Sequence, residues 1–183
     1  KCAFILHTDP KDQHGTDLKA VREAFCDPNY VNVFFSSDKL PTAQLNLLYN
    51  MADATILLSS NEGWGLGLTE SLMTATPIIA NVTGGMQDQM RFSKDGKWVD
   101  FTPDFPSNHR GTIKDHGDWA FPVYPSSRSI AGSLPTPYIF DDKCTPEDAA
   151  IAIEQVYNLS PKERDAAGKK GYNWVTGDEA NMT

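Results

Sequence analysis

The chain has 183 residues, of which 40% are hydrophobic and 22% are charged, an ordinary composition for a globular protein. This length allows one well-buried core and is too short for two α/β domains of ordinary size, so we predict a single domain over residues 1–183. The formal net charge of −8 argues against a nucleic-acid partner, because a phosphate backbone binds to basic patches. No apolar run approaches the length of a membrane span, so we expect no transmembrane segment.

The three cysteines, Cys2, Cys26 and Cys144, are an odd number without CxxC spacing. They therefore favour neither a disulfide scaffold nor a zinc site, and a reducing, cytoplasmic location is expected. The segment Lys1–Pro10 lacks the basic, apolar and small-residue parts of a signal peptide. Its abrupt apolar start without a methionine predicts a fragment of a longer protein.

Strands and helices are predicted to alternate over the first half of the chain. Short β-branched and aliphatic runs indicate strands, and apolar residues at helical spacing indicate helices. The predicted elements are a strand at 2–6, a helix at 17–25, a strand at 31–35, a helix at 41–51 and a strand at 54–58.

A glycine-rich loop follows the strand at 54–58, with Gly63, Gly65 and Gly67 at alternate positions. A helix comes next and ends before Pro77, where a second buried strand begins and runs to Val82. This order completes a βαβ unit, so we predict an α/β fold built on a Rossmann-like parallel sheet with helices on both faces. In such a sheet the ligand site lies at the carboxyl ends of the strands.

The glycine loop itself suggests an anion site. Glycine lets another molecule approach the main chain closely. The first N–H groups of a helix have no partner within the helix, and the peptide dipoles there favour negative charge. A phosphate or diphosphate is therefore the expected guest.

Two carboxylates, Glu62 and Glu70, flank this loop and lie eight residues apart. Because they repel a phosphate, we expect them to accept hydrogen bonds from sugar hydroxyls on either side of it. By themselves, two glutamates at this spacing are commonplace. Taken with the loop, they describe a site for a nucleotide-sugar donor.

The second half of the chain is less regular. We predict a long irregular insertion at about 91–140, followed by two C-terminal helices at 146–157 and 160–175. The insertion holds four residues of metal-binding types, His109, Asp115, His116 and Asp118, for which a solvated surface is the expected role. The pair Asp141-Asp142 is expected to be a solvated turn.

Residues 59–88 resemble the signature of the family-4 retaining glycosyltransferases of the GT-B fold. That signature has two acidic residues separated by seven others, then a helix, a buried strand, and a Gly-Gly turn followed by an acidic residue. The matching positions are Ser59, Glu62, Gly63, Trp64, Gly65, Leu66, Glu70, Ser71, Leu72, Pro77, Ile78, Ile79, Ala80, Gly84, Gly85 and Asp88, without a gap.

The resemblance covers residues 1–90 and 140–175 and implies the C-terminal, donor-binding half of a GT-B enzyme. It implies that Glu62 contacts the transferred sugar as the catalytic residue and that Glu70 binds the ribose. The main-chain amides of Gly63, Trp64, Gly65 and Leu66 would hold the diphosphate. It implies a UDP-, GDP- or ADP-sugar as donor, transfer with retention, no essential metal or other cofactor, and a separate N-terminal half that carries the acceptor site.

The sequence departs from the family at the phosphate clamp. The family has an Arg after the first strand and a Lys-Gly soon after it, whereas this chain has no arginine in that loop and His14 stands before Gly15. Lys11, His14 or Arg128 would have to supply the cation. The charge of a leaving diphosphate needs such a group, so its loss would weaken catalysis.

Two alternatives stay open at this point. The domain is either a glycosyltransferase half, inactive when isolated, or a non-catalytic nucleotide-sugar-binding or scaffold domain with a degenerate phosphate clamp. An NAD-dependent Rossmann enzyme is disfavoured, because the dinucleotide fingerprint belongs after the first strand and only Gly15 occurs there.

Overall fold

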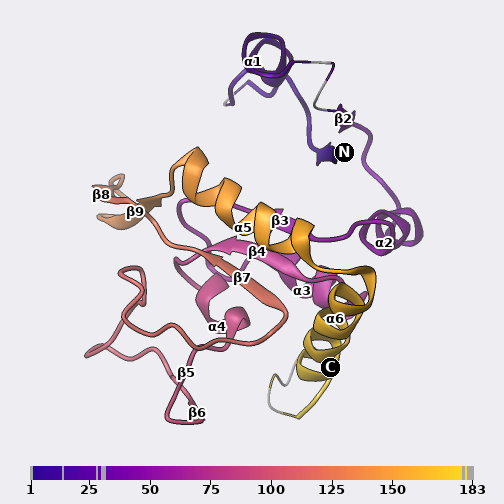
Figure 1. Cartoon of the computed structure of the whole chain (residues 1–183). Helices are drawn as coiled ribbons and strands as arrows, with labels where there is room; N and C mark the ends of the chain where they lie inside the picture. The colour runs from indigo at the N-terminus through magenta and orange to yellow at the C-terminus, as the bar shows by residue number, and fades with distance from the viewer. Residues whose placement is uncertain (1, 14, 28, 30–31, 179, 181–183) are drawn as a thin grey trace. The chain divides into compact units, whose positions relative to one another are not determined.

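The computed structural model describes residues 2–13, 15–27, 29, 32–178 and 180 (Figure 1). The chain forms two compact units, residues 1–44 and residues 45–183. The prediction of a single domain over residues 1–183 stays a prediction.

The first unit is a strand–helix–strand arrangement of β1 (Ala3–His7), α1 (Leu18–Phe25) and β2 (Asn32–Ser36). The two strands pair in parallel from Ala3 opposite Asn32 to His7 opposite Ser36. Asp17 caps α1, because its carboxylate accepts hydrogen bonds from the N–H groups of Lys19 and Ala20. The predicted elements are confirmed here, although Val31 lies outside the described residues.

The second unit contains a parallel sheet in the order β3-β4-β7. Its strands are β3 (Thr55–Leu57), β4 (Ile78–Asn81) and β7 (Ala120–Val123), and α2 (Thr42–Asn50) precedes β3. All four residues of the central strand β4 are buried. A parallel strand covered on both faces reads as a continuous apolar run, which is why 77–82 was recognisable in the sequence.

Side chains on β4 alternate between two packed clusters. Ile78 and Ala80 face a core formed with α3 (Leu66–Met73), α4 (Met86–Met90) and α6 (Pro161–Val175). Ile79 faces the opposite side, where Ala152 and Val156 of α5 (Pro146–Asn158) pack with Val123 of β7. Figure 1 shows α5 on one side of the sheet and α3 and α4 on the other. Helices on both faces, as predicted, are therefore confirmed for this unit.

Capping boxes begin both C-terminal helices. The Thr145 hydroxyl accepts from the N–H of Asp148, and the Ser160 hydroxyl accepts from that of Glu163. In each case the acidic side chain accepts a hydrogen bond back from the cap residue. The two predicted helices are confirmed almost to the residue.

The insertion at 91–140 is only partly irregular. It contains the short hairpin β5 (Ser93–Lys94) and β6 (Lys97–Trp98), then β7, then β8 (Ser127–Ala131), which pairs antiparallel with β9 (Ile139–Lys143). The sequence did not reveal β7 because Pro122 interrupts its short apolar run. Proline is tolerated at the edge of a sheet, and β7 occupies the outer position of its three strands.

No helix within the described residues is long and apolar enough to cross a membrane.

Candidate functional site

The predicted glycine loop connects β3 to α3 and depends on Gly65. This residue is the N-cap of α3 with φ of 83°, in the left-handed region that favours glycine. A Cβ atom here would lie 3.0 Å from Met86 Cγ and 3.2 Å from Leu57 Cδ2. Conformation and packing therefore both require glycine at this position.

The Gly-Gly turn packs directly against the backbone of this loop. The N–H of Gly85 donates to the carbonyl of Glu62 over 3.1 Å. A Cβ atom on Gly84 would lie 2.1 Å from the Glu62 oxygen, and one on Gly85 would lie 2.1 Å from the Gly63 oxygen. The two glycine segments of the signature thus form one backbone-to-backbone contact.

Gln89 holds the loop from inside the protein. This fully buried side chain on α4 donates to the carbonyls of Trp64 over 2.6 Å and Gly65 over 3.2 Å. The Trp64 indole N–H donates to the Thr69 hydroxyl over 2.8 Å, and that hydroxyl donates to Gln89 Oε1 over 2.9 Å. Every polar group in this triangle has a partner, as buried polar groups require.

Three main-chain amides of the loop have no partner within the described part of the fold. Among the residues that the structure describes, the main-chain N–H groups of Gly63, Trp64 and Leu66 have no hydrogen-bond acceptor. Gly63 is exposed, and the Leu66 side chain is 69% exposed, so this part of the loop is not covered by packed side chains. Exposed donors at the start of a helix suit an anion.

The two predicted carboxylates belong to the same loop and helix. Glu62 is half-buried, and Glu70 is exposed near the start of α3. The Tyr49 hydroxyl at the end of α2 donates to Glu70 Oε2 over 2.8 Å. Burial and the Glu70 carboxylate raise the pKa of Tyr49, so this phenol stays a donor and orients the carboxylate.

The predicted clamp residues Lys11 and His14 come from the first unit. Lys11 Nζ lies 3.1 Å from Asp17 Oδ2 in an exposed ion pair. His14 lies outside the described residues.

Arg128, the third clamp candidate, is paired with Asp142. Arg128 Nε lies 2.6 Å from Asp142 Oδ1, and Nη2 lies 2.8 Å from Oδ2, so the ion pair is bidentate. The Arg128 guanidinium also lies over the ring of Phe140. The Asp142 side chain is 0% exposed and also accepts from the Thr83 hydroxyl. The prediction of a solvated turn is therefore wrong for Asp142, because pairing of β8 with β9 buries it.

The pKa of Asp142 reflects two opposing causes. Burial acts to raise this pKa, while the hydrogen bonds from Arg128 and Thr83 and the positive charge of Arg128 lower it. The effect of the hydrogen bonds and of the positive charge is larger than that of burial, so the pKa of Asp142 lies below its usual range. Arg128 is thus committed to a carboxylate within the fold.

Three of the four residues of metal-binding type in the insertion have side-chain partners. His109 Nδ1 contacts the Ser107 hydroxyl, His116 Nδ1 contacts the carbonyl of Gly117, and Asp118 pairs with Lys170. No group of three or more His, Cys, Asp or Glu side chains within the described ranges could hold a metal ion.

Sequence reasoning missed the residues that support the loop, namely Tyr49, Thr69 and Gln89. Gln89 had no local signal, because the segment Met86–Met90 contains three polar residues and nothing in its sequence distinguishes the buried ones. Tyr49 is half-buried, and its contact with Glu70 joins residues 21 positions apart, so no local pattern reveals it.

Comparisons with known proteins agree with the signature. Residues 29–105 match the family model described as glycosyl transferases group 1. The chain is 37% identical over 60 residues to a D-inositol 3-phosphate glycosyltransferase of Corynebacterium urealyticum, covering 33% of this chain and 14% of that protein. It is 26% identical over 110 residues to the enzyme of the same name from Acidothermus cellulolyticus, covering 60% of this chain and 24% of the relative.

Among solved structures, the catalytic domain of starch synthase IV from Arabidopsis thaliana, bound to ADP and acarbose, matches with a TM-score of 0.48 and 16% identity. The match covers 87% of this chain and 27% of that one. This chain spans 14% and 24% of the two curated relatives. The match of residues 29–105 to the group 1 glycosyltransferase model agrees with the resemblance and with the enzyme class predicted from the sequence.

Proposed function

We propose that this chain is the donor-binding part of a glycosyltransferase. It binds a UDP-, GDP- or ADP-linked sugar and, together with an N-terminal GT-B half that carries the acceptor site, transfers the glycosyl group with retention. The isolated chain binds the donor and turns over little, because the acceptor site belongs to the other half.

The observation that carries this proposal is the set of main-chain amides at the start of α3 that have no acceptor among the described residues, with Glu70 one turn into that helix. A diphosphate accepts hydrogen bonds from the amides of residues 63–66 without requiring a buried charge. Glu70, oriented by Tyr49, accepts from the ribose hydroxyls. Glu62 contacts the transferred sugar next to the reacting carbon.

The reaction proposed here uses no essential metal. The loop amides donate hydrogen bonds that stabilise the negative charge of the leaving diphosphate, and Lys11 or His14 supplies the positive charge. The Lys11–Asp17 pair is exposed, with side chains 62% and 43% accessible, so exchanging Asp17 for a phosphate costs little free energy. We also place the chain in the cytoplasm, a proposal supported by its three unpaired cysteines.

Calorimetry with UDP, GDP and ADP tests the proposal. One of the three is expected to bind, and Glu70→Gln is expected to weaken it about tenfold through loss of a charge-assisted hydrogen bond. Glu154→Gln on the exposed surface of α5 is the matched control and should leave the affinity unchanged. Failure of all three nucleotides at millimolar concentration contradicts the proposal, and binding of NAD instead would favour a Rossmann dehydrogenase.

A second candidate function, a non-catalytic nucleotide-sugar-binding or scaffold domain, is favoured by one observation. Two of the three clamp candidates, Lys11 and Arg128, already contact carboxylates. The experiment that separates the two functions is restoration of the N-terminal half. Donor transfer or hydrolysis in the restored protein supports the enzyme, whereas donor binding without either supports the scaffold.

A further inference from the structure

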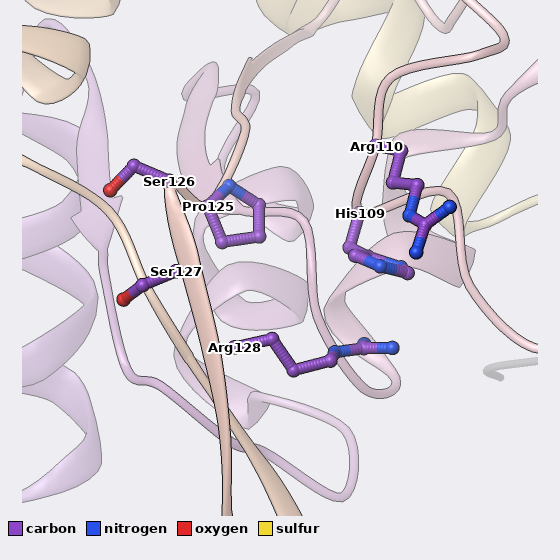
Figure 2. A pocket seen from close by; sticks show the side chains of 6 residues that line it. All are labelled: His109, Arg110, Pro125, Ser126, Ser127 and Arg128. Atoms are coloured by element: carbon purple, nitrogen blue, oxygen red, sulfur yellow. The ribbon is translucent and has the colours of Figure 1, made fainter.

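The insertion forms a cavity of its own, with a volume of about 420 Å³. Its lining residues are His109, Arg110, Pro125, Ser126, Ser127 and Arg128. Figure 2 shows the side chains of His109, Arg110 and Arg128 extending to the same side, with the hydroxyls of Ser126 and Ser127 on the other. The volume is in the range of small-molecule sites. None of these residues belongs to the glycine loop.

Ser107 links His109 to Gln87 and Arg128. Its hydroxyl donates to Gln87 Oε1 over 3.2 Å, and the same Gln87 oxygen accepts from the Asn108 N–H over 2.7 Å. The Ser107 oxygen accepts from the main-chain N–H of His109 over 3.1 Å and from Arg128 Nη2 over 3.4 Å. His109 Nδ1 lies 3.2 Å from the Ser107 oxygen. These contacts hold the His109 ring close to the Arg128 guanidinium.

The surroundings of His109 favour the neutral form of its ring. Burial and the positive charge of Arg128 lower the pKa of His109, Arg110 lowers it further, and Asp142 acts in the opposite direction. Asp142 already compensates Arg128. Arg110 has no carboxylate partner among the described residues. The cavity therefore carries an uncompensated positive charge, although the chain as a whole has a formal charge of −8.

We propose that this cavity binds a phosphate or sulfate ester group and that the His109 ring takes up a proton when the anion enters. Arg110 supplies an exposed guanidinium, and Arg128, which uses Nε and Nη2 on Asp142 and Ser107, keeps Nη1 for the ligand. With protonated His109 this gives three donor groups, which match the three free oxygens of such an ester. A carboxylate has two oxygens and therefore accepts from fewer of these three donor groups.

Titration with inorganic sulfate tests the proposal, because the charge of sulfate stays constant over the relevant pH range. Binding is followed by calorimetry and by the NMR signal of the His109 ring. Affinity is expected to rise about fivefold between about pH 8 and about pH 6, since the bound anion favours the protonated ring. Inorganic phosphate should shift the same resonance, and acetate should bind more weakly than sulfate.

Two variants locate the effect. Arg110→Gln is expected to weaken sulfate binding about tenfold at both ends of this range. His109→Gln should keep the wild-type affinity at high pH and lose the increase at low pH. Lys97→Gln, which removes an exposed charge on β6, is the control and should change neither. Arg128 is left intact because its loss would leave Asp142 buried without a partner.

Sulfate binding that is equal in wild type and Arg110→Gln would overturn the proposal, as would a pH dependence that survives in His109→Gln. A preference for acetate over sulfate would reject the ester class. Nucleotide binding in Arg110→Gln should match wild type, so the outcome here is independent of the outcome at the glycine loop.

Discussion

The glycine loop before α3 and the Arg128–Asp142 ion pair are both hydrogen-bonded to residues 83–85, yet they use their polar groups in different ways. In the loop, Gln89 donates to the carbonyls from inside, and the amides of Gly63, Trp64 and Leu66 have no acceptor among the described residues. In the ion pair, the buried carboxylate of Asp142 is paired with Arg128, whereas the neighbouring Arg110 has no carboxylate partner in the described part of the chain.

The difference follows from the cost of burial. A backbone amide at the start of a helix is a donor without a net charge, so the fold can leave it free at little cost. A buried carboxylate such as Asp142 requires a counter-ion, because an isolated charge in a protein interior is strongly destabilising. A fold can therefore offer an anion site from its main chain more readily than from its buried arginines.

The largest expected effect comes from breaking the buried ion pair. Asp142→Asn should lower the free energy of unfolding by about 3 kcal/mol, because it leaves Arg128 without its charge partner. Urea unfolding measures the change. The matched control is Asp53→Asn, which removes an ion pair with Arg164 whose aspartate is 78% exposed and should cost less than about 1 kcal/mol. Equal losses in the two variants would show that burial does not distinguish them.

The next effect is at Gln89. Gln89→Leu should lower the free energy of unfolding by about 2 kcal/mol, because it leaves the carbonyls of Trp64 and Gly65 without a donor. Nucleotide affinity should fall as well, since the loop loses its fixed shape. Gln155→Leu on the exposed side of α5 is the control. Unchanged affinity in a folded Gln89→Leu variant would show that the loop keeps its conformation without this support.

A smaller effect tests the contact between the two glycine segments. Gly85→Ala should lower the free energy of unfolding by about 1–2 kcal/mol, because the added Cβ must displace the backbone at Gly63. Gly63→Ala is the control for stability, since a Cβ there has no atom within 4 Å. Thermal unfolding of both variants gives the comparison. An unchanged unfolding temperature in Gly85→Ala would mean that the turn and the loop can move apart at little cost in stability.

The smallest effect is a dependence on pH. The pKa of Asp142 is lower in the folded protein than in the unfolded chain. Its contribution to stability is therefore complete above the unfolded value of about 3.9 and is lost as the pH falls through the folded-state pKa. Urea midpoints of wild type and Asp142→Asn should converge as the pH drops below about 4. A constant difference down to acidic pH would mean that the pair does not depend on ionised Asp142.

Much of the fold could be predicted from local sequence patterns. The strands that became β1, β3 and β4 are short apolar runs, and α5 and α6 begin at capping boxes that can be read directly from Thr145 and Ser160. The position of the glycine loop, with Glu62 and Glu70 around it, was equally clear. These features depend on residues close together in the chain, where propensity and spacing carry the information.

The rest was decided by tertiary structure. Pairing of β7 with β4, the burial of Asp142 against Arg128, and the support of the loop by Gln89 all join residues that are far apart in sequence or lack a local signal. A polar side chain looks the same in a sequence whether it meets water or a buried partner, because only the packed chain determines its surroundings. The sequence by itself determined which segments form the α/β core and where the glycine loop lies, while the fold decided which of the described main-chain donors stay without a partner.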